Sequence, residues 1–253
     1  PCRLRRWWVL GLRWSAMILP QPLLRGTLVR RYNRFMADVV LDSAITVTAH
    51  CPNSGSMLSV NTPGSEVWLS PATDPNRKLK YTWELIRVGE ALVGINTHRA
   101  NGIVAEALSR GAIAELCGYT DMRREVRYGS KSRIDLLLQS PNCPNCYVEV
   151  KNVTLKRTLA DGSLAEFPDA VTARGTKHLV DLAEVVKRGE RAVMMYLLQR
   201  SDSDTFAIAA DIDPMYAAAL AQAKAVGVEV LAYRCCVTTT TITITDRVRA
   251  VLP

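Results

Sequence analysis

The sequence lacks a hydrophobic run long enough to cross a membrane. Its apolar stretch near the N-terminus, from Trp7 to Leu12, is short and is followed by Arg13, whereas a spanning helix needs about 20 apolar residues. The stretch is also shorter than the apolar region of a usual export signal. Residues 1–16 are therefore predicted to be a disordered or non-native leader, no membrane partner is expected, and the cytoplasm is the expected location.

The sequence also lacks the cysteine pattern of a disulfide framework or a zinc finger. Its seven cysteines are odd in number and scattered, which favours reduced thiols. Cys143 and Cys146 form one CxxC, but a second CxxC or a spaced Cys/His pair is missing, so two zinc ligands would be absent. We interpret this CxxC as an incidental loop between two strands.

The leader contains no acidic residue and four arginines. It therefore contributes half of the formal net charge of +8. A basic balance favours polyanionic partners but does not specify a fold. The sequence shows no internal repeat and no helix-turn-helix signature, so direct reading of DNA bases is not supported. Any DNA contact is expected to involve mainly the phosphate backbone.

Two regions of different pattern follow the leader. Residues 23–95 contain short β-branched runs separated by Pro, Gly, Asn and Ser turns, which favours a small barrel or sandwich. After Asn96 the order is helix, three strands, helix, strand, helix and strand, which is typical of a mixed α/β layer around a central sheet. The Thr-Ile alternation near the C-terminus predicts a terminal strand. We predict domains at 17–95 and 96–253.

The strongest chemical signal is Asp135 followed by Glu149 and Lys151. Alternation along a strand places Glu149 and Lys151 on one face, and pairing of the two strands would bring Asp135 beside them. Two carboxylates suit Mg²⁺ or Mn²⁺, and the ammonium group of Lys151 suits an attacking water or a charged phosphate. The alternative is an exposed strand face with a surface Glu–Lys pair.

Several strings resemble the sugar fermentation stimulation protein A family and cover the chain from about residue 23 to 251. They occur in the order RGTLVRRYNRFMADV, HCPNSGSM, TPGSEVWLS, TWEL, YGSKSRIDLLL, CYVEVKNVTL, FPDAVTARGTKHL and GVEVLAYR. The resemblance implies an OB-fold-like barrel followed by a restriction-endonuclease-like domain of the PD-(D/E)-x-K type, in which Asp135, Glu149 and Lys151 match the catalytic core. It also places Glu106 where related nucleases carry another acid; the alternative is a solvated helix residue.

Further candidates for DNA contact lie in both domains. One set is basic or aromatic and belongs to the barrel: Arg25, Arg30, Arg31, Tyr32 and Arg34. A second set shares a stripe of the helix near residues 170–188: Arg174, Lys177 and His178. The loop residues His50, Asn53 and Ser54 either hold their loop or face a ligand, and the sequence does not separate these alternatives.

These observations predict a DNA-binding protein of low sequence specificity, which the family resemblance connects with regulation of sugar metabolism genes. The alternative is a Mg²⁺- or Mn²⁺-dependent nuclease that acts through Asp135, Glu149 and Lys151. A third interpretation is a structural or protein-interaction module. The sequence leaves the oligomeric state open.

Overall fold

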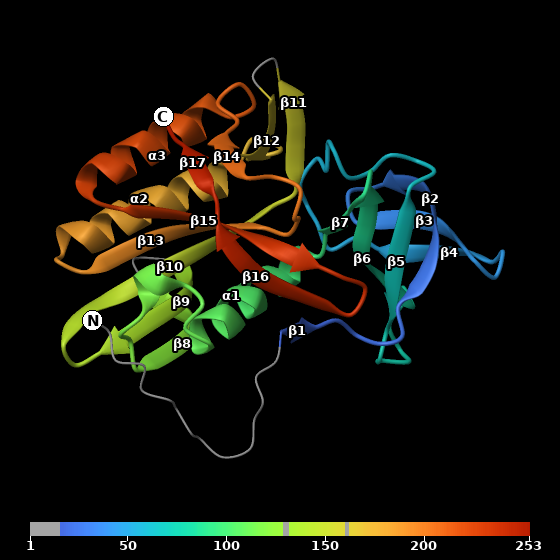
Figure 1. The fold of residues 1–253 in the computed structure, drawn as a ribbon, viewed down its shortest axis with the longest axis horizontal. Helices are drawn as coiled ribbons and strands as arrows, with labels where there is room; N and C mark the ends of the chain where they lie inside the picture. Colours follow the sequence, from blue (N-terminus) through green and yellow to red (C-terminus); the bar gives the residue numbers. More distant parts are fainter. Residues whose placement is uncertain (1–15, 129–131, 160–161) are drawn as a thin grey trace.

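The computed structural model describes residues 16–128, 132–159 and 162–253. A small β-barrel and a larger α/β domain lie next to each other (Figure 1). Residues 1–15 of the predicted leader and residues 129–131 of the YGSKSRIDLLL motif lie outside the described residues. None of the helices in the described part combines the length and the hydrophobicity that a membrane span requires.

The N-terminal domain is a closed barrel of five strands with the OB connectivity. Its strands, together with an added edge strand, are β2 (Leu24–Tyr32), β3 (Met36–Leu41), β4 (Thr46–His50), β5 (Glu66–Pro71), β6 (Tyr81–Val88) and β7 (Ala91–Gly94). They pair in the order β4-β3-β2-β5-β6-β7, and a parallel β4–β6 pairing closes the ring. Alternate residues fill the interior, among them Leu28, Val39 and Trp83. The predicted all-β, OB-like N-terminal part is thus confirmed.

The C-terminal domain is built on a seven-stranded mixed sheet. Its strand order is β1-β16-β15-β13-β10-β9-β8, in which β10, β13 and β15 run parallel. These strands are β1 (Met17–Ile18), β8 (Asp121–Tyr128), β9 (Ser132–Ser140), β10 (Cys143–Val153), β13 (Arg191–Leu198), β15 (Glu229–Val237) and β16 (Thr241–Arg247). The strand predicted from the Thr-Ile alternation is β16. The mixed α/β prediction for this domain is confirmed.

Helices cover both faces of this sheet. They are η1 (Thr97–Arg99), α1 (Ala100–Ser109), η2 (Ala114–Leu116), α2 (Ala173–Lys187) and α3 (Pro214–Val226). Ordinary capping sets their ends: the Thr172 hydroxyl accepts from the Gly175 N–H at the start of α2, and Gly227 ends α3 with φ +117°.

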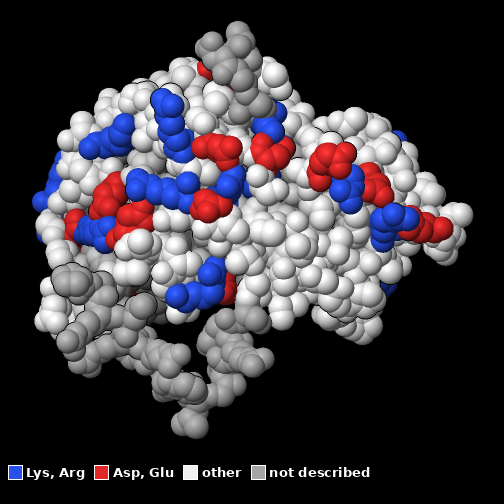
Figure 2. Space-filling model, viewed as in Figure 1, with Lys and Arg blue, Asp and Glu red and all other residues white. Residues whose placement is uncertain are grey.

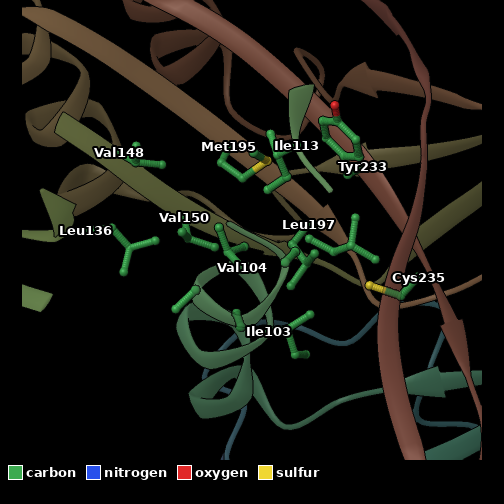
Figure 3. Packing of buried hydrophobic residues seen from close by; sticks show 14 of the residues in the cluster. Ile103, Val104, Ile113, Leu136, Val148, Val150, Met195, Leu197, Tyr233 and Cys235 are labelled. Carbon is green, nitrogen blue, oxygen red and sulfur yellow. The ribbon is translucent and has the colours of Figure 1, made fainter. Parts of the chain in front are cut away.

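Alternation along β13 divides the interior into two apolar layers. Val193, Met195 and Leu197 face α1 and the hydrophobic cluster drawn in Figure 3. Met194 and Tyr196 face the opposite way, toward α2 and α3. All of these side chains are fully buried, so the central strand must be apolar on both faces.

A second, four-stranded sheet was not predicted from the sequence. It contains β11 (Leu155–Leu159), β12 (Gly162–Phe167), β14 (Thr205–Ile208) and β17 (Arg249–Val251), in this order. These strands are short and irregularly spaced, so their pattern is weak in the sequence.

Two details differ from the sequence-based prediction. Met17–Ile18 fall within the predicted barrel domain 17–95 but pair with Thr241 and Ile242 of β16, because β16 offers them an unpaired edge. In a regular strand Ile134 and Leu136 would share a face, but their side chains belong to different apolar clusters. The regular alternation of β9 breaks between them.

The cysteines of the described residues are free thiols, as expected. Cys143 is exposed at the start of β10, whereas Cys146 is buried. Burial raises the pKa of the Cys146 thiol to about 12, which disfavours the thiolate needed for redox chemistry.

Candidate functional site

Asp135 and Glu149 occupy facing positions on the adjacent strands β9 and β10. The strand register pairs Leu137 with Tyr147 and Leu136 with Val148. One further step along both strands brings Asp135 opposite Glu149. The convergence expected from the sequence is therefore a property of this register.

Glu149 is almost completely buried, at 2% exposure. Its Oε1 atom accepts from Lys151 Nζ at 2.8 Å and contacts Nδ1 of His178 on α2. Burial alone would raise the pKa of Glu149, but the His178 contact and the charge of Lys151 lower it below its usual value. Its Oε2 atom has no hydrogen-bond partner among the described residues, which leaves one buried carboxylate oxygen free to coordinate a cation.

Asp135 is held by two donors from different elements. Its Oδ2 accepts the Val150 N–H at 2.8 Å, and its Oδ1 accepts from Asn101 Nδ2 of α1 at 2.8 Å. Burial, followed by the negative charge of Glu149, raises the pKa of Asp135 to about 6. Sequence reasoning missed Asn101 as a site residue.

A buried ion pair at the domain junction fixes the start of α1. Glu84 of β6 accepts from Arg99 Nη2 at 2.8 Å, from Asn96 Nδ2 at 2.8 Å and from the Ser70 hydroxyl at 2.7 Å. Burial would raise the pKa of Glu84, but Arg99, Ser70 and Asn96 lower it. Because every contact converges on one carboxylate, the helix that carries Asn101 is tied to the barrel wall.

A cleft of about 450 Å³ lies between the barrel and the α/β domain. Asn101 and Lys151, which contact Asp135 and Glu149, line this cleft, whereas the two carboxylates themselves do not. Predicted site residues from four segments line it: Arg34, Asn53, Ser54, Lys151 and Arg174. The remaining lining comes mainly from Asn101, Asn152 and the segment 167–173 that leads into α2. The structure therefore brings together candidates that are up to 140 residues apart in the sequence.

Hydrogen bonds from both domains hold the barrel loop at residues 52–57. On the barrel side, Arg31 donates to the Asn53 and Gly55 carbonyls at 2.9 and 2.8 Å. On the other side, the Asp169 carboxylate accepts the Met57 N–H at 2.8 Å. A Cβ on Gly55 would collide with the Asp169 carboxylate, so a larger residue here would force that carboxylate away from the Met57 N–H.

The sequence left open whether His50, Asn53 and Ser54 hold their loop or face a ligand, and the structure gives a different answer for each residue. The Asn53 side chain accepts the Gly55 N–H at 2.9 Å and so holds the loop. Ser54 lines the cleft. His50 ends β4 and does not line the cleft, and burial lowers its pKa. Arg31 likewise supports the loop.

Other predicted residues lie away from the cleft. Arg25 pairs with Asp42 and Glu66, and Arg30 and Tyr32 both contact a single barrel carboxylate, Asp38. These side chains lie on the outer barrel surface.

Two predicted residues of the α/β domain also have local partners. Lys177 bonds Ser132 Oγ at 2.5 Å and Asp181 Oδ2 at 2.9 Å. Glu106 is buried and bonds Arg110 Nε at 2.7 Å, and Arg110 also reaches the Ile244 carbonyl on β16. The structure does not bring Glu106 together with Asp135, which α1 contacts through Asn101 instead.

Charge is intermixed on the face shown in Figure 2, where acidic and basic side chains lie side by side over the α/β domain. The net positive charge is thus not gathered as one continuous area on this face.

Comparison with known proteins gives concordant results for both domains. Residues 29–95 match the SfsA N-terminal OB domain, and residues 98–241 match the sugar fermentation stimulation protein RE domain. A sugar fermentation stimulation protein homolog of Rhodospirillum rubrum is 58% identical over 226 residues, which cover 87% of this chain and 92% of the relative. A homolog of Paramagnetospirillum magneticum is 60% identical over 214 residues, covering 85% and 89%.

A solved structure shows the same fold. Pyrococcus furiosus SfsA in complex with Ca²⁺ aligns with a TM-score of 0.84 and 22% identity, covering 94% of this chain and all of that one. The two family models together match more than half of the described chain. The chain belongs to the sugar fermentation stimulation protein family.

Proposed function

We propose that this chain binds DNA with low sequence specificity through the cleft between its two domains. The observation that supports this most directly is the set of three cationic side chains that line it: Arg34, Lys151 and Arg174. Asp169 is the acidic lining residue, and its carboxylate already accepts the Met57 N–H. Such a lining suits phosphate groups.

The start of α2 adds a second favourable feature. Residues 170–174 enter this helix along the cleft wall, and the first N–H groups of a helix attract anions. Phosphate contacts position DNA without reading bases, so we expect weak sequence preference and strong salt dependence. The names of the relatives connect the family with sugar fermentation, and regulation of sugar metabolism genes is the role we propose for this binding.

A matched pair of arginine variants tests this proposal. Arg174→Ala removes an exposed cation from the cleft, whereas Arg25→Ala removes an exposed cation from the outer barrel. DNA affinity is measured in EDTA over a series of salt concentrations. We expect Arg174→Ala to weaken binding to all sequences and to reduce the salt slope by about 1. Equal affinity and slope for wild type and both variants would refute binding in the cleft.

A second candidate function is cleavage of DNA with Mg²⁺ or Mn²⁺. The free, buried Oε2 of Glu149 and the adjacent carboxylate of Asp135 are oxygen donors that fit such a cation. The solved relative is described in complex with Ca²⁺, another oxygen-preferring cation. In the described residues, however, no three His, Cys, Asp or Glu side chains already form a ligand cluster.

The residues of the chain define what each group would do. Asp135 and Glu149 would hold the cation, which would supply Lewis-acid chemistry at a phosphate oxygen. Lys151, with its ammonium 2.8 Å from Glu149, would hold a water or offset the charge of the phosphate. Asn101 would orient Asp135.

Incubation with duplex, single-stranded and branched DNA plus Mg²⁺ or Mn²⁺ tests this second function. We expect cleavage by the wild type and by the surface control Asp121→Asn, and loss of cleavage in Asp135→Ala and Lys151→Ala. Cleavage retained by both active-site variants would refute the assignment. Binding without cleavage would refute the nuclease and leave the binding function.

A further inference from the structure

Two exposed arginines face each other across the hairpin formed by β8 and β9. The strand register pairs Arg127 directly with Arg133, and both side chains are exposed. Neither forms an ion pair with an acidic residue in the described part of the chain. Like charges at directly facing positions of two strands repel and destabilise the pairing. A bound anion would offset this repulsion, because it would attract both side chains.

Protection of the sheet edge does not account for this pair. The strand β8 is the last strand of the seven-stranded sheet, and charged side chains on an edge strand discourage pairing with another chain. Such a role suits Arg127. Arg133, however, belongs to β9, which has β8 on one side and β10 on the other. The second positive charge, opposite the first, therefore requires another explanation.

Both arginines lie on the face of the hairpin that is turned away from α2. The neighbouring residues Tyr128 and Ile134 pack into the apolar cluster that contains the buried side of α2. Because successive residues of a strand point to opposite faces, Arg127 and Arg133 point the other way. The two charges consequently share one face and are not separated by the sheet.

The acidic residues closest to them along the two strands already have a partner. Residues 126–128 and 132–134 include both arginines and no acidic residue. The next residue inward on each strand is acidic, and Glu125 and Asp135 both accept from Asn101 Nδ2, at 3.2 and 2.8 Å. Asn101 also lines the cleft. One contact of α1 therefore connects the cleft with the hairpin.

A second contact, from α2, connects the same two places. Lys177 Nζ bonds the Ser132 hydroxyl, and Ser132 directly precedes Arg133 in β9. Lys177 lies three residues after Arg174, which lines the cleft, and residues three apart are neighbours on a helix surface. The end of the hairpin that carries the two arginines therefore lies beside the cleft.

We propose that Arg127 and Arg133 form a second phosphate-binding surface, on which DNA continues beyond the cleft. The inference rests on the proposed DNA binding and extends it from the cleft to the β8–β9 hairpin. The occupant is the phosphate backbone, since a guanidinium group binds phosphate oxygens through two parallel N–H···O bonds. The Cβ atoms of facing strand residues are about 4.5–5.5 Å apart, so both side chains can reach one phosphate group or two neighbouring ones.

Variants of the two arginines test the proposal. The affinity of the full chain for a fluorescently labelled DNA duplex is measured in EDTA over a series of salt concentrations. We expect Arg127→Ala and Arg133→Ala each to weaken binding and to reduce the salt slope by about 1, and the double variant to reduce it by about 2. The matched control is Arg188→Ala, which removes an exposed arginine after the far end of α2 and should bind like the wild type.

Thermal unfolding without DNA separates binding from folding. Removal of one of two like charges relieves their repulsion, so neither single variant should be less stable than the wild type. Lower stability of both variants would overturn the proposal, because a structural role would then explain the weaker binding. Self-association of the variants in size-exclusion chromatography would overturn it as well, in favour of protection of the sheet edge.

The remaining outcomes separate this inference from the proposed function. Unchanged affinity and salt slope in the double variant overturn the hairpin surface, while weaker binding by Arg174→Ala would still support the cleft. Equal weakening by Arg188→Ala also overturns the hairpin surface, because general surface charge then explains the effect. A wild type that binds no DNA overturns both the proposed function and this inference.

Discussion

Replacement of Asp135 by asparagine is expected to stabilise the cation-free protein at alkaline pH. Burial and the charge of Glu149 raise the pKa of Asp135 to about 6 from an ordinary value of 3.8. A difference of about two pKa units corresponds to about 3 kcal/mol between the charged and neutral forms. The ionised Asp135 therefore lowers the free energy of unfolding, and a neutral side chain of the same shape removes this cost.

The pH dependence has a defined sign. Between pH 3.8 and about 6 the folded protein binds more protons at Asp135 than the unfolded chain does. Stability from this residue is therefore fully present below pH 3.8 and is lost as pH rises through about 6. In Asp135→Asn the new amide oxygen would accept the Val150 N–H, while the new amide nitrogen requires Asn101 to turn. We consequently expect a net gain of about 1–3 kcal/mol at about pH 8, shrinking to none near pH 4.

Urea unfolding followed by tryptophan fluorescence, in EDTA and at several pH values, measures this effect. The control Asp121→Asn should show no such pH-dependent gain. Addition of Mn²⁺ should then raise the stability of the wild type but not of Asp135→Asn, since a ligand stabilises only the state that binds it. If Asp135→Asn is no more stable than the wild type at about pH 8, the ionised Asp135 carboxylate does not destabilise the fold and this reasoning is refuted.

Three further variants follow from the packing. Gly55→Ala should weaken DNA binding and destabilise the fold by about 1–3 kcal/mol, since its Cβ meets Asp169; thermal unfolding and DNA affinity measure both effects. Arg99→Ala should cost about 3–5 kcal/mol in urea unfolding, because Glu84 would remain charged and buried without its cation, and a cost below about 1 kcal/mol would contradict this. Leu197→Ala should cost about 2–5 kcal/mol in the same assay, because the side chain is fully buried between the sheet and α1, and unchanged stability would contradict that packing.

The fold class was predictable because the spacing of apolar residues differs between the two domains: it alternates as in strands in the first domain, and helical spacing appears only in the second. Strand alternation and turn residues mark the barrel, and the helix predicted near residues 170–188 corresponds to α2 at Ala173–Lys187. The sheet of β11, β12, β14 and β17 was not predictable, since its strands are three to six residues long. Pairings between such short segments depend on tertiary contacts more than on local sequence.

The candidate site was predictable only in part. Strand alternation was enough to place Glu149 and Lys151 on one face, whereas the position of Asp135 beside them depends on the pairing of β9 with β10. Arg34 and Arg174 meet across a cleft whose shape depends on how the two domains pack, and no local pattern encodes that packing. Asn101 was missed because its contact with Asp135 depends on how α1 packs against the sheet, and the local sequence of the helix does not encode that packing.

The pairing of β1 with β16 also determines how the barrel is attached. Within the described residues, the chain begins in the large sheet at Met17–Ile18, where the Leu19 N–H donates to the Thr240 carbonyl at 2.8 Å. It returns to the same domain at η1 after completing the barrel. The barrel is thus an insertion with two anchor points, which restricts any hinge motion that would open the cleft widely. A cut made after Ile95 would deprive the α/β domain of an edge strand, so the halves are expected to fold better as one polypeptide than as separately expressed fragments.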